Sequence, residues 1–75
     1  MSAEAISGSI SVVVNGESRR AAAGLTVTQL LEQLGIHGGR VAIERNLQIL
    51  SRAEWNTSLV ADGDRYEIVQ FVGGG

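Results

Sequence analysis

The sequence predicts a small α+β domain in which one main helix packs on one face of a mixed sheet of four to five strands. Three observations lead to this fold class. Apolar and polar residues alternate near both ends of the chain, a helical apolar pattern lies between these segments, and two-residue turns separate short strands. A single helix among such hairpins is expected to cover one face of the sheet.

The size and composition allow one folded domain and disfavour several kinds of function. The chain has 75 residues, of which 44% are hydrophobic and 19% are charged, as in ordinary folded domains. It contains no cysteine, which excludes disulfides and thiol chemistry and suits the cytoplasm. A net charge of −2 without a basic run argues against binding to nucleic acid. No apolar run approaches the roughly 20 residues of a membrane span, and no signal peptide pattern is present.

The first part of the domain is predicted to be a β-hairpin. Residues 1–9 are mostly small and polar, so we expect a flexible leader there and a folded domain over residues 10–72. Ser9 to Val14 alternate as in a strand, and Asn15-Gly16 is the preferred two-residue hairpin turn. Glu17 to Ala23 then return as an edge strand, whose two arginines discourage pairing with another chain.

A helix is predicted to begin after Thr26, because Gly24 interrupts the second strand. Thr26 and Gln29 have the spacing of a capping box, in which each side chain satisfies a backbone amide at the helix start. Gly35 suits the left-handed position that follows a helix. Four apolar residues share one helical face and are expected in the core: Val27, Leu30, Leu31 and Leu34.

A second hairpin and a short helical turn are expected after the helix. Val41 to Glu44 and Leu47 to Leu50 read as strands, with Arg45-Asn46 as the tight turn between them. Ser51 and Glu54 repeat the capping-box spacing, which predicts one helical turn there.

That turn is expected to carry Trp55 into the core, and the connector that follows is expected to place Leu59 inward. Asp62-Gly63-Asp64 then forms a turn before the last strand, Arg65 to Val72.

The two faces of the last strand are predicted to have different roles. Alternation assigns Tyr66, Ile68, Gln70 and Val72 to one face, which should meet the core. Val69 and Phe71 share the other face with charged residues, so we expect them to be exposed. Exposed apolar groups close to the end of the chain suggest a surface on which a partner docks, although they could instead cover a sheet edge or the leader.

The sequence ends in Gly73-Gly74-Gly75, which we expect to be a flexible tail over residues 73–75. Because glycine has no Cβ, such a tail could carry a terminal carboxylate into a narrow active site of another protein. We find no other candidate for chemistry. His37 is the single histidine and has no partner residue at a recognisable spacing, and phosphate-loop and metal-ligand motifs are absent. We expect no bound cofactor or metal and no catalytic residue.

These features in their order resemble the thiamine-pathway sulfur carrier family (ThiS), whose members have a ubiquitin-like β-grasp fold. The resemblance extends from Ile10 to Gly75. It rests on Asn15-Gly16, Thr26-Val27-x-x-Leu30-Leu31, Val41-Ala42-Ile43, Trp55, Asp62-Gly63-Asp64 and Gly74-Gly75.

The resemblance implies a carrier that partner enzymes act on. An ATP-dependent, E1-like activating enzyme would adenylate the carboxylate of Gly75, and sulfur from a source such as a cysteine desulfurase would replace AMP to leave a thiocarboxylate. The family's thiazole synthase would then take this sulfur. ATP would be used by the activating partner, Gly73 and Gly74 would enter partner active sites, and Val69 and Phe71 would dock.

Other functions are compatible with this fold and C-terminus. The small subunit of molybdopterin synthase has the same fold and terminus, but typically a proline before its Gly-Gly, where this chain has Gln70-Phe71-Val72-Gly73 and no proline at all. Sulfur carriers for cysteine, tRNA thiolation or secondary metabolites are further alternatives. A protein modifier would be joined to lysines of its targets, and its own lack of lysine would exclude chains built through its side chains. A plain interaction domain would leave the tail inert.

Overall fold

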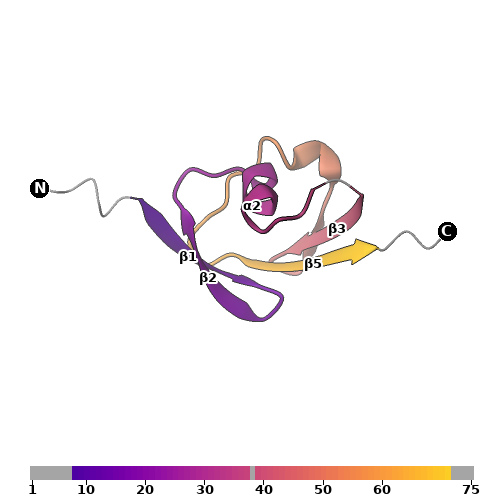
Figure 1. The fold of residues 1–75 in the computed structure, drawn as a ribbon. Coiled ribbons are helices and arrows are strands. Elements are labelled where there is room, and N and C mark those ends of the chain that lie inside the picture. The colour runs from indigo at the N-terminus through magenta and orange to yellow at the C-terminus, as the bar shows by residue number, and fades with distance from the viewer. Residues whose placement is uncertain (1–7, 38, 72–75) are drawn as a thin grey trace, which may run out of the picture.

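A computed structural model of the protein describes residues 8–37 and 39–71, which form one five-stranded sheet with a helix across it (Figure 1). The strands lie in the order β2-β1-β5-β3-β4; β1 and β5 are parallel, and the other neighbours are antiparallel. The strands are β1 (Ser9–Val14), β2 (Glu17–Ala22), β3 (Arg40–Arg45), β4 (Gln48–Leu50) and β5 (Arg65–Phe71); the helices are α2 (Val27–Gln33) and the 3₁₀ turn η1 (Arg52–Glu54). The predicted mixed sheet with one main helix is confirmed.

Helix α2 begins at the predicted capping box. The Thr26 hydroxyl accepts a hydrogen bond from the Gln29 amide at 3.2 Å, and the Gln29 side chain accepts one from the Thr26 amide at 2.9 Å. Gly35 follows the helix with a φ of +79°, the left-handed conformation that glycine adopts without a steric cost. Local sequence signals therefore define both ends of this helix.

The core fills the space between α2 and one face of the sheet. Val27, Leu30 and Leu31 of the helix are buried, whereas Leu34 is half-buried and packs against the edge of the same cluster. Trp55 is also buried, as predicted, and its indole N–H donates to the Leu50 carbonyl at 3.1 Å. The sheet contributes mainly Val12, Val14, Ile43, Tyr66 and Ile68.

The prediction that Leu59 points inward is wrong. Leu59 is 60% exposed, and the neighbouring Val60 is buried in its place. The Val60 amide donates to the Leu25 carbonyl, and the Val27 amide donates to the Ser58 carbonyl. These bonds fix the register of the connector against the start of α2. Since successive residues of an extended segment point in opposite directions, placing Val60 inward turns Leu59 outward.

The second capping box is also wrong, although a helical turn does form there. Ser51 occupies the position before η1, but its side chain makes no capping hydrogen bond. The amide of Glu54 instead donates to the backbone carbonyl of Ser51 at 2.9 Å. The three-residue spacing of a 3₁₀ turn satisfies this amide without a side chain.

The turn of the second hairpin lies one residue later than predicted. Arg45 pairs with Gln48, so Asn46 and Leu47 form the turn, with φ values of +52° and +71°. Asparagine tolerates this left-handed conformation, but leucine rarely adopts it.

Two details at the ends of strands also differ from the sequence reading. Gln70, expected on the core face, is exposed; it pairs with Val41, which is only half-buried where it packs against the core. Val72 lies outside the described residues. At the other end of the chain β1 begins at Ser9, one residue before the predicted start of the domain.

Candidate functional site

The start of β5 is held by a buried carboxylate. Asp64 accepts hydrogen bonds from the Tyr66 hydroxyl at 2.8 Å, the Ala61 amide at 3.0 Å and the Asn46 side chain at 3.1 Å. Burial raises the pKa of Asp64, but these three hydrogen bonds and the charge of Arg45 together outweigh burial and hold this pKa below its ordinary value of 3.8. Asp64 is therefore an ionised, fully bonded anchor for the strand.

Two turn asparagines hold the backbone of β5. The side chain of Asn15 accepts from the Ile68 amide at 2.7 Å and donates to the Ile68 carbonyl at 3.1 Å. The side chain of Asn46 accepts from the Arg65 amide at 2.9 Å. Sequence reasoning assigned both asparagines only to turns and missed these contacts. The amide side chain itself was the one available signal, since it can bond a strand as a second backbone would.

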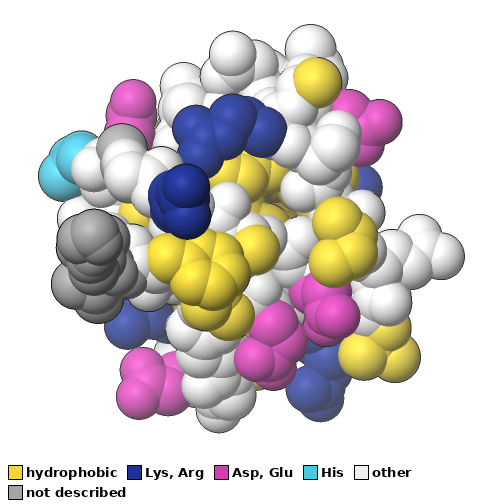
Figure 2. Space-filling view, turned by 90° about the vertical axis from the view of Figure 1, so that its right-hand side faces the viewer, with side chains coloured by type: hydrophobic (Ala, Val, Ile, Leu, Met, Phe, Trp, Pro, Cys, Tyr) yellow, Lys and Arg dark blue, Asp and Glu magenta, His cyan; other side chains and the backbone are white. Residues whose placement is uncertain are grey.

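Near the end of β5, apolar side chains lie on the open face of the sheet, which is the face opposite α2. Val69 and Phe71 are 51% and 54% exposed, so their predicted exposure is confirmed. Leu47 and Ile49, at 88% and 77% exposed, extend this apolar surface. Figure 2 shows hydrophobic side chains gathered at this end of the molecule, with acidic and basic side chains next to them. Sequence analysis missed Leu47 and Ile49, although alternation from the buried Leu50 indicates the outward direction of Ile49.

A shallow hollow of about 490 Å³ lies within this surface, which we call the docking face. The pairing of β3 with its neighbours places Glu44 between Ile49 and Glu67, and Ala42 opposite Val69. Six residues line the hollow: Ala42, Glu44, Leu47, Ile49, Glu67 and Val69. The docking face comprises these residues and Phe71.

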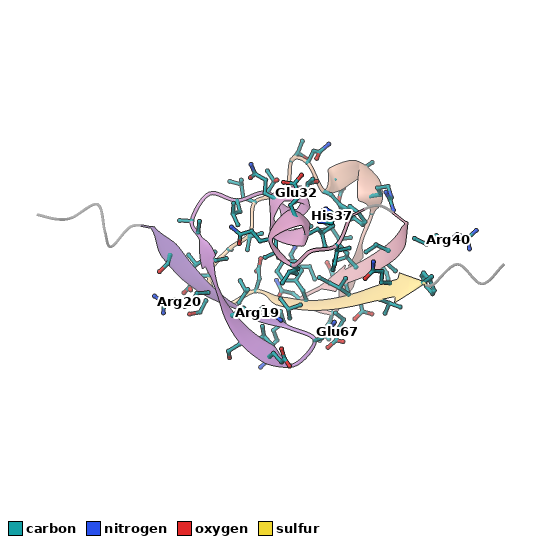
Figure 3. The ribbon with its side chains drawn as sticks, viewed as in Figure 1. Arg19, Arg20, Glu32, His37, Arg40 and Glu67 are labelled. Atoms are coloured by element: carbon teal, nitrogen blue, oxygen red, sulfur yellow. The ribbon has the colours of Figure 1, made fainter. Side chains whose placement is uncertain are left out.

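A second hollow, also of about 490 Å³, lies between α2 and η1. The Arg52 guanidinium stacks 4.7 Å from the centre of the Trp55 ring and donates to the Gly39 carbonyl at 3.2 Å. The Thr28 hydroxyl and the Asn56 side chain are 2.6 Å apart. Glu32 and His37 lie on this side of the molecule, whereas Glu67 lies on the other side of the sheet (Figure 3). Three of the polar side chains that line this hollow, those of Thr28, Arg52 and Asn56, are therefore engaged in contacts within the protein.

Within residues 8–37 and 39–71, no group of three or more His, Asp or Glu side chains is placed to hold a metal ion. In the same part of the chain, no helix combines the length and the apolar character that crossing a membrane requires. The predicted site residues Gly73, Gly74 and Gly75 lie outside the described residues, so their roles remain predictions.

The order of the strands, the single helix on one face and the anchored last strand define a β-grasp domain. The model of the ThiS family matches residues 12–75, which is most of the chain. The chain belongs to the ThiS family.

Known proteins support this assignment over nearly the whole domain. A thiazole synthase of Paramagnetospirillum magneticum is 47% identical over 64 residues, which are 85% of this chain but only 20% of that relative. The sulfur carrier protein ThiS of Escherichia coli is 38% identical over 64 residues, 85% of this chain and 97% of that protein. A solved thiamine biosynthesis protein (ThiS) from Geobacter metallireducens has a TM-score of 0.70 and 34% identity, covering 88% of this chain and all of that one.

Proposed function

We propose that this protein is a sulfur carrier of thiamine biosynthesis and is acted on by partner enzymes rather than being an enzyme itself. The observation that carries this proposal is the match to the ThiS family over residues 12–75, which includes the terminal glycines. The E. coli relative, of which the chain covers 97%, is named for the same role.

The proposed chemistry takes place at Gly75. A terminal carboxylate has a pKa of about 3.3–3.7 and is an anion at neutral pH. It attacks the α-phosphate of ATP in an activating enzyme, and pyrophosphate leaves to give an acyl adenylate. Sulfur from a cysteine desulfurase or a similar donor displaces AMP and leaves a thiocarboxylate. Because the reaction uses ATP and the chain has no cysteine, we place it in the cytoplasm.

Thiazole synthase is the proposed acceptor of this sulfur. The relative from P. magneticum, named as a thiazole synthase, contains a stretch similar to this chain within a much longer protein. A relative from Magnetococcus marinus with the same name is 40% identical over 62 residues, 19% of its length. The occurrence of this stretch in proteins with that name favours thiazole synthase over molybdopterin synthase as the partner.

The docking face is the proposed contact with both enzymes. Gly75 lies four residues after Phe71, and this stretch spans at most about 14 Å when extended. A protein that encloses Gly75 therefore reaches the end of β5, where Val69 and Phe71 are exposed. The anchored start of the strand would hold this end in a fixed direction.

The proposal is tested by the intact mass of the chain after incubation with the adenylating enzyme from the same organism, ATP and a sulfur donor. We expect a mass increase equal to the exchange of one oxygen for sulfur, and no increase when Gly75 is deleted. The deletion should leave the thermal unfolding temperature unchanged. The carrier function is excluded if the wild-type mass stays constant while the enzyme remains active.

Two related outcomes separate the alternatives. Covalent adducts to other proteins would indicate a modifier. A pull-down of a thiazole synthase, as opposed to a molybdopterin synthase large subunit, would identify the acceptor.

A further inference from the structure

Two carboxylates face each other in the middle of the docking face. Glu44 of β3 pairs directly with Glu67 of β5, and Ile49 lies on the other side of Glu44. Like charges directly opposite each other on neighbouring strands destabilise a sheet. Glu67 is exposed and Glu44 is half-buried, and both belong to the wall of the apolar hollow.

Within residues 8–37 and 39–71, neither carboxylate forms an ion pair with a basic side chain. The ion pair found there joins Arg19 and Glu17, at 3.4 Å. Arg40 and Arg65 share the open face by alternation, yet neither forms an ion pair with Glu44 or Glu67. In Figure 3, Arg40 lies near the end of β5, apart from Glu67.

Leu47 adds a second unfavourable feature to the same hollow. Its φ of +71° is a conformation that costs a residue with a side chain about 1–2 kcal/mol relative to the ordinary helical region. Its side chain is nevertheless 88% exposed and forms part of the wall of the hollow. Strained positions that serve no purpose in the core often occur where a protein meets a ligand or partner.

We propose that the docking face selects its partner through a basic side chain, most suitably an arginine, that enters between Glu44 and Glu67. This inference rests on the proposed function, because the partner is the enzyme that adenylates Gly75. The hollow beside the two carboxylates receives an apolar group of the partner against Leu47, Ile49 and Val69.

The chemistry of the two groups explains this choice of partner. A guanidinium is planar and carries donors that can bond two carboxylates at once, and its weak hydration suits an apolar setting. Its positive charge would also offset the two like charges that the pairing of β3 with β5 places opposite each other. The partner surface is therefore expected to be an arginine flanked by apolar residues, as is common at the centres of interfaces.

The inference is tested with two double variants that remove the same number of charges. Glu44→Gln with Glu67→Gln changes the docking face, and Glu32→Gln with Glu54→Gln changes exposed acids outside it. Affinity for the purified adenylating enzyme from the same organism is measured by calorimetry, and stability by urea unfolding. We expect Kd to rise at least about tenfold for the first double variant and to change less than about twofold for the control.

Stability provides a readout that separates binding from folding. The first double variant should be at least as stable as the wild type, since it removes the repulsion between like charges. Equal Kd values for the two double variants would overturn the inference, as would a loss of stability that accompanies the loss of affinity.

The intact mass distinguishes this inference from the proposed function. If the wild-type chain gains sulfur but the two double variants bind equally, the inference fails and the carrier function stands. If the wild-type chain gains no sulfur, the carrier function itself fails.

Discussion

The β1–β2 and β3–β4 hairpins have the same backbone turn but differ in its second residue. Both connections are two residues long and begin with an asparagine, Asn15 at a φ of +50° and Asn46 at +52°. The second residue is Gly16 in one turn, at +85°, and Leu47 in the other, at +71°. Turns with two positive φ values match the twist of a hairpin, and glycine is the residue that fits them best.

The first residues of the two turns have the same structural role, because both side chains bond the backbone of β5. Asn15 bonds the backbone of Ile68, and Asn46 bonds the backbone of Arg65 and the carboxylate of Asp64. The two hairpins therefore hold β5 from opposite sides, although β1 itself pairs with only the first two residues of β5. The direction in which β5 leaves the domain depends on both asparagines.

The second residues of the turns show what differs between the hairpins. Gly16 fits its turn without strain, whereas Leu47 has an unfavourable conformation and an exposed apolar side chain. The turn of the first hairpin thus carries no conformational strain. The turn of the second hairpin lowers the stability of the fold and places an apolar side chain on the docking face.

The largest expected effect is that of Asn15→Ala. Alanine loses both hydrogen bonds to Ile68 and disfavours the positive φ, so we expect a loss of about 3 kcal/mol in the free energy of unfolding. Asn15→Gly keeps the turn conformation and should lose about half as much. Urea unfolding of the two variants checks this. Equal stabilities for wild type and Asn15→Ala would show that the asparagine does not hold β5.

Asp64→Asn should cost about 2 kcal/mol at neutral pH, because an amide cannot replace the carboxylate that accepts three hydrogen bonds. The folded-state pKa of Asp64 lies below its unfolded value. Its contribution to stability is therefore present above a pH of about 4 and is lost as the pH falls through the folded-state pKa.

Urea unfolding at a series of pH values checks the direction of this pH dependence. The stability difference between wild type and Asp64→Asn should shrink below a pH of about 4. A difference that stays constant into strong acid would contradict the assignment of an ionised Asp64.

The smallest expected effect on folding comes from exchanging the second turn residues. Leu47→Gly should raise the free energy of unfolding by about 1 kcal/mol, since glycine relieves the strained φ, and Gly16→Leu should lower it by a similar amount. Leu47→Gly should nevertheless weaken binding to the adenylating enzyme, whereas Gly16→Leu should not. If Leu47→Gly binds as tightly as the wild type, the strain at Leu47 serves no partner.

Local signals allowed much of the fold to be predicted. The capping box at Thr26, the Asn15-Gly16 turn and the alternation of β5 from Arg65 to Val69 each depend on residues close in sequence, and the structure confirms them. The glycine tail was identified from sequence alone and stays a prediction, because it lies outside the described residues.

The errors share a different physical origin. The prediction for Leu59 is wrong because the direction of this side chain depends on the register between its connector and Leu25. Leu25 is far away in sequence, so the local pattern does not show that register. Leu47 was assigned to a strand because leucine is rare in a left-handed turn. The bonds from Asn15 and Asn46 to β5 join residues far apart in sequence, and no local pattern indicates them.

The central claim is that partners bind the open face of the sheet at the end of β5, and an NMR titration tests it most directly. The ¹⁵N-labelled chain is titrated with the unlabelled adenylating enzyme, and the amide signals that shift or broaden are mapped on the structure. We predict the largest changes at Glu44, Leu47, Ile49, Val69 and Phe71, which belong to the docking face. Changes centred instead on Thr28, Glu32, His37 and Asn56, around the hollow beside α2, would contradict the account.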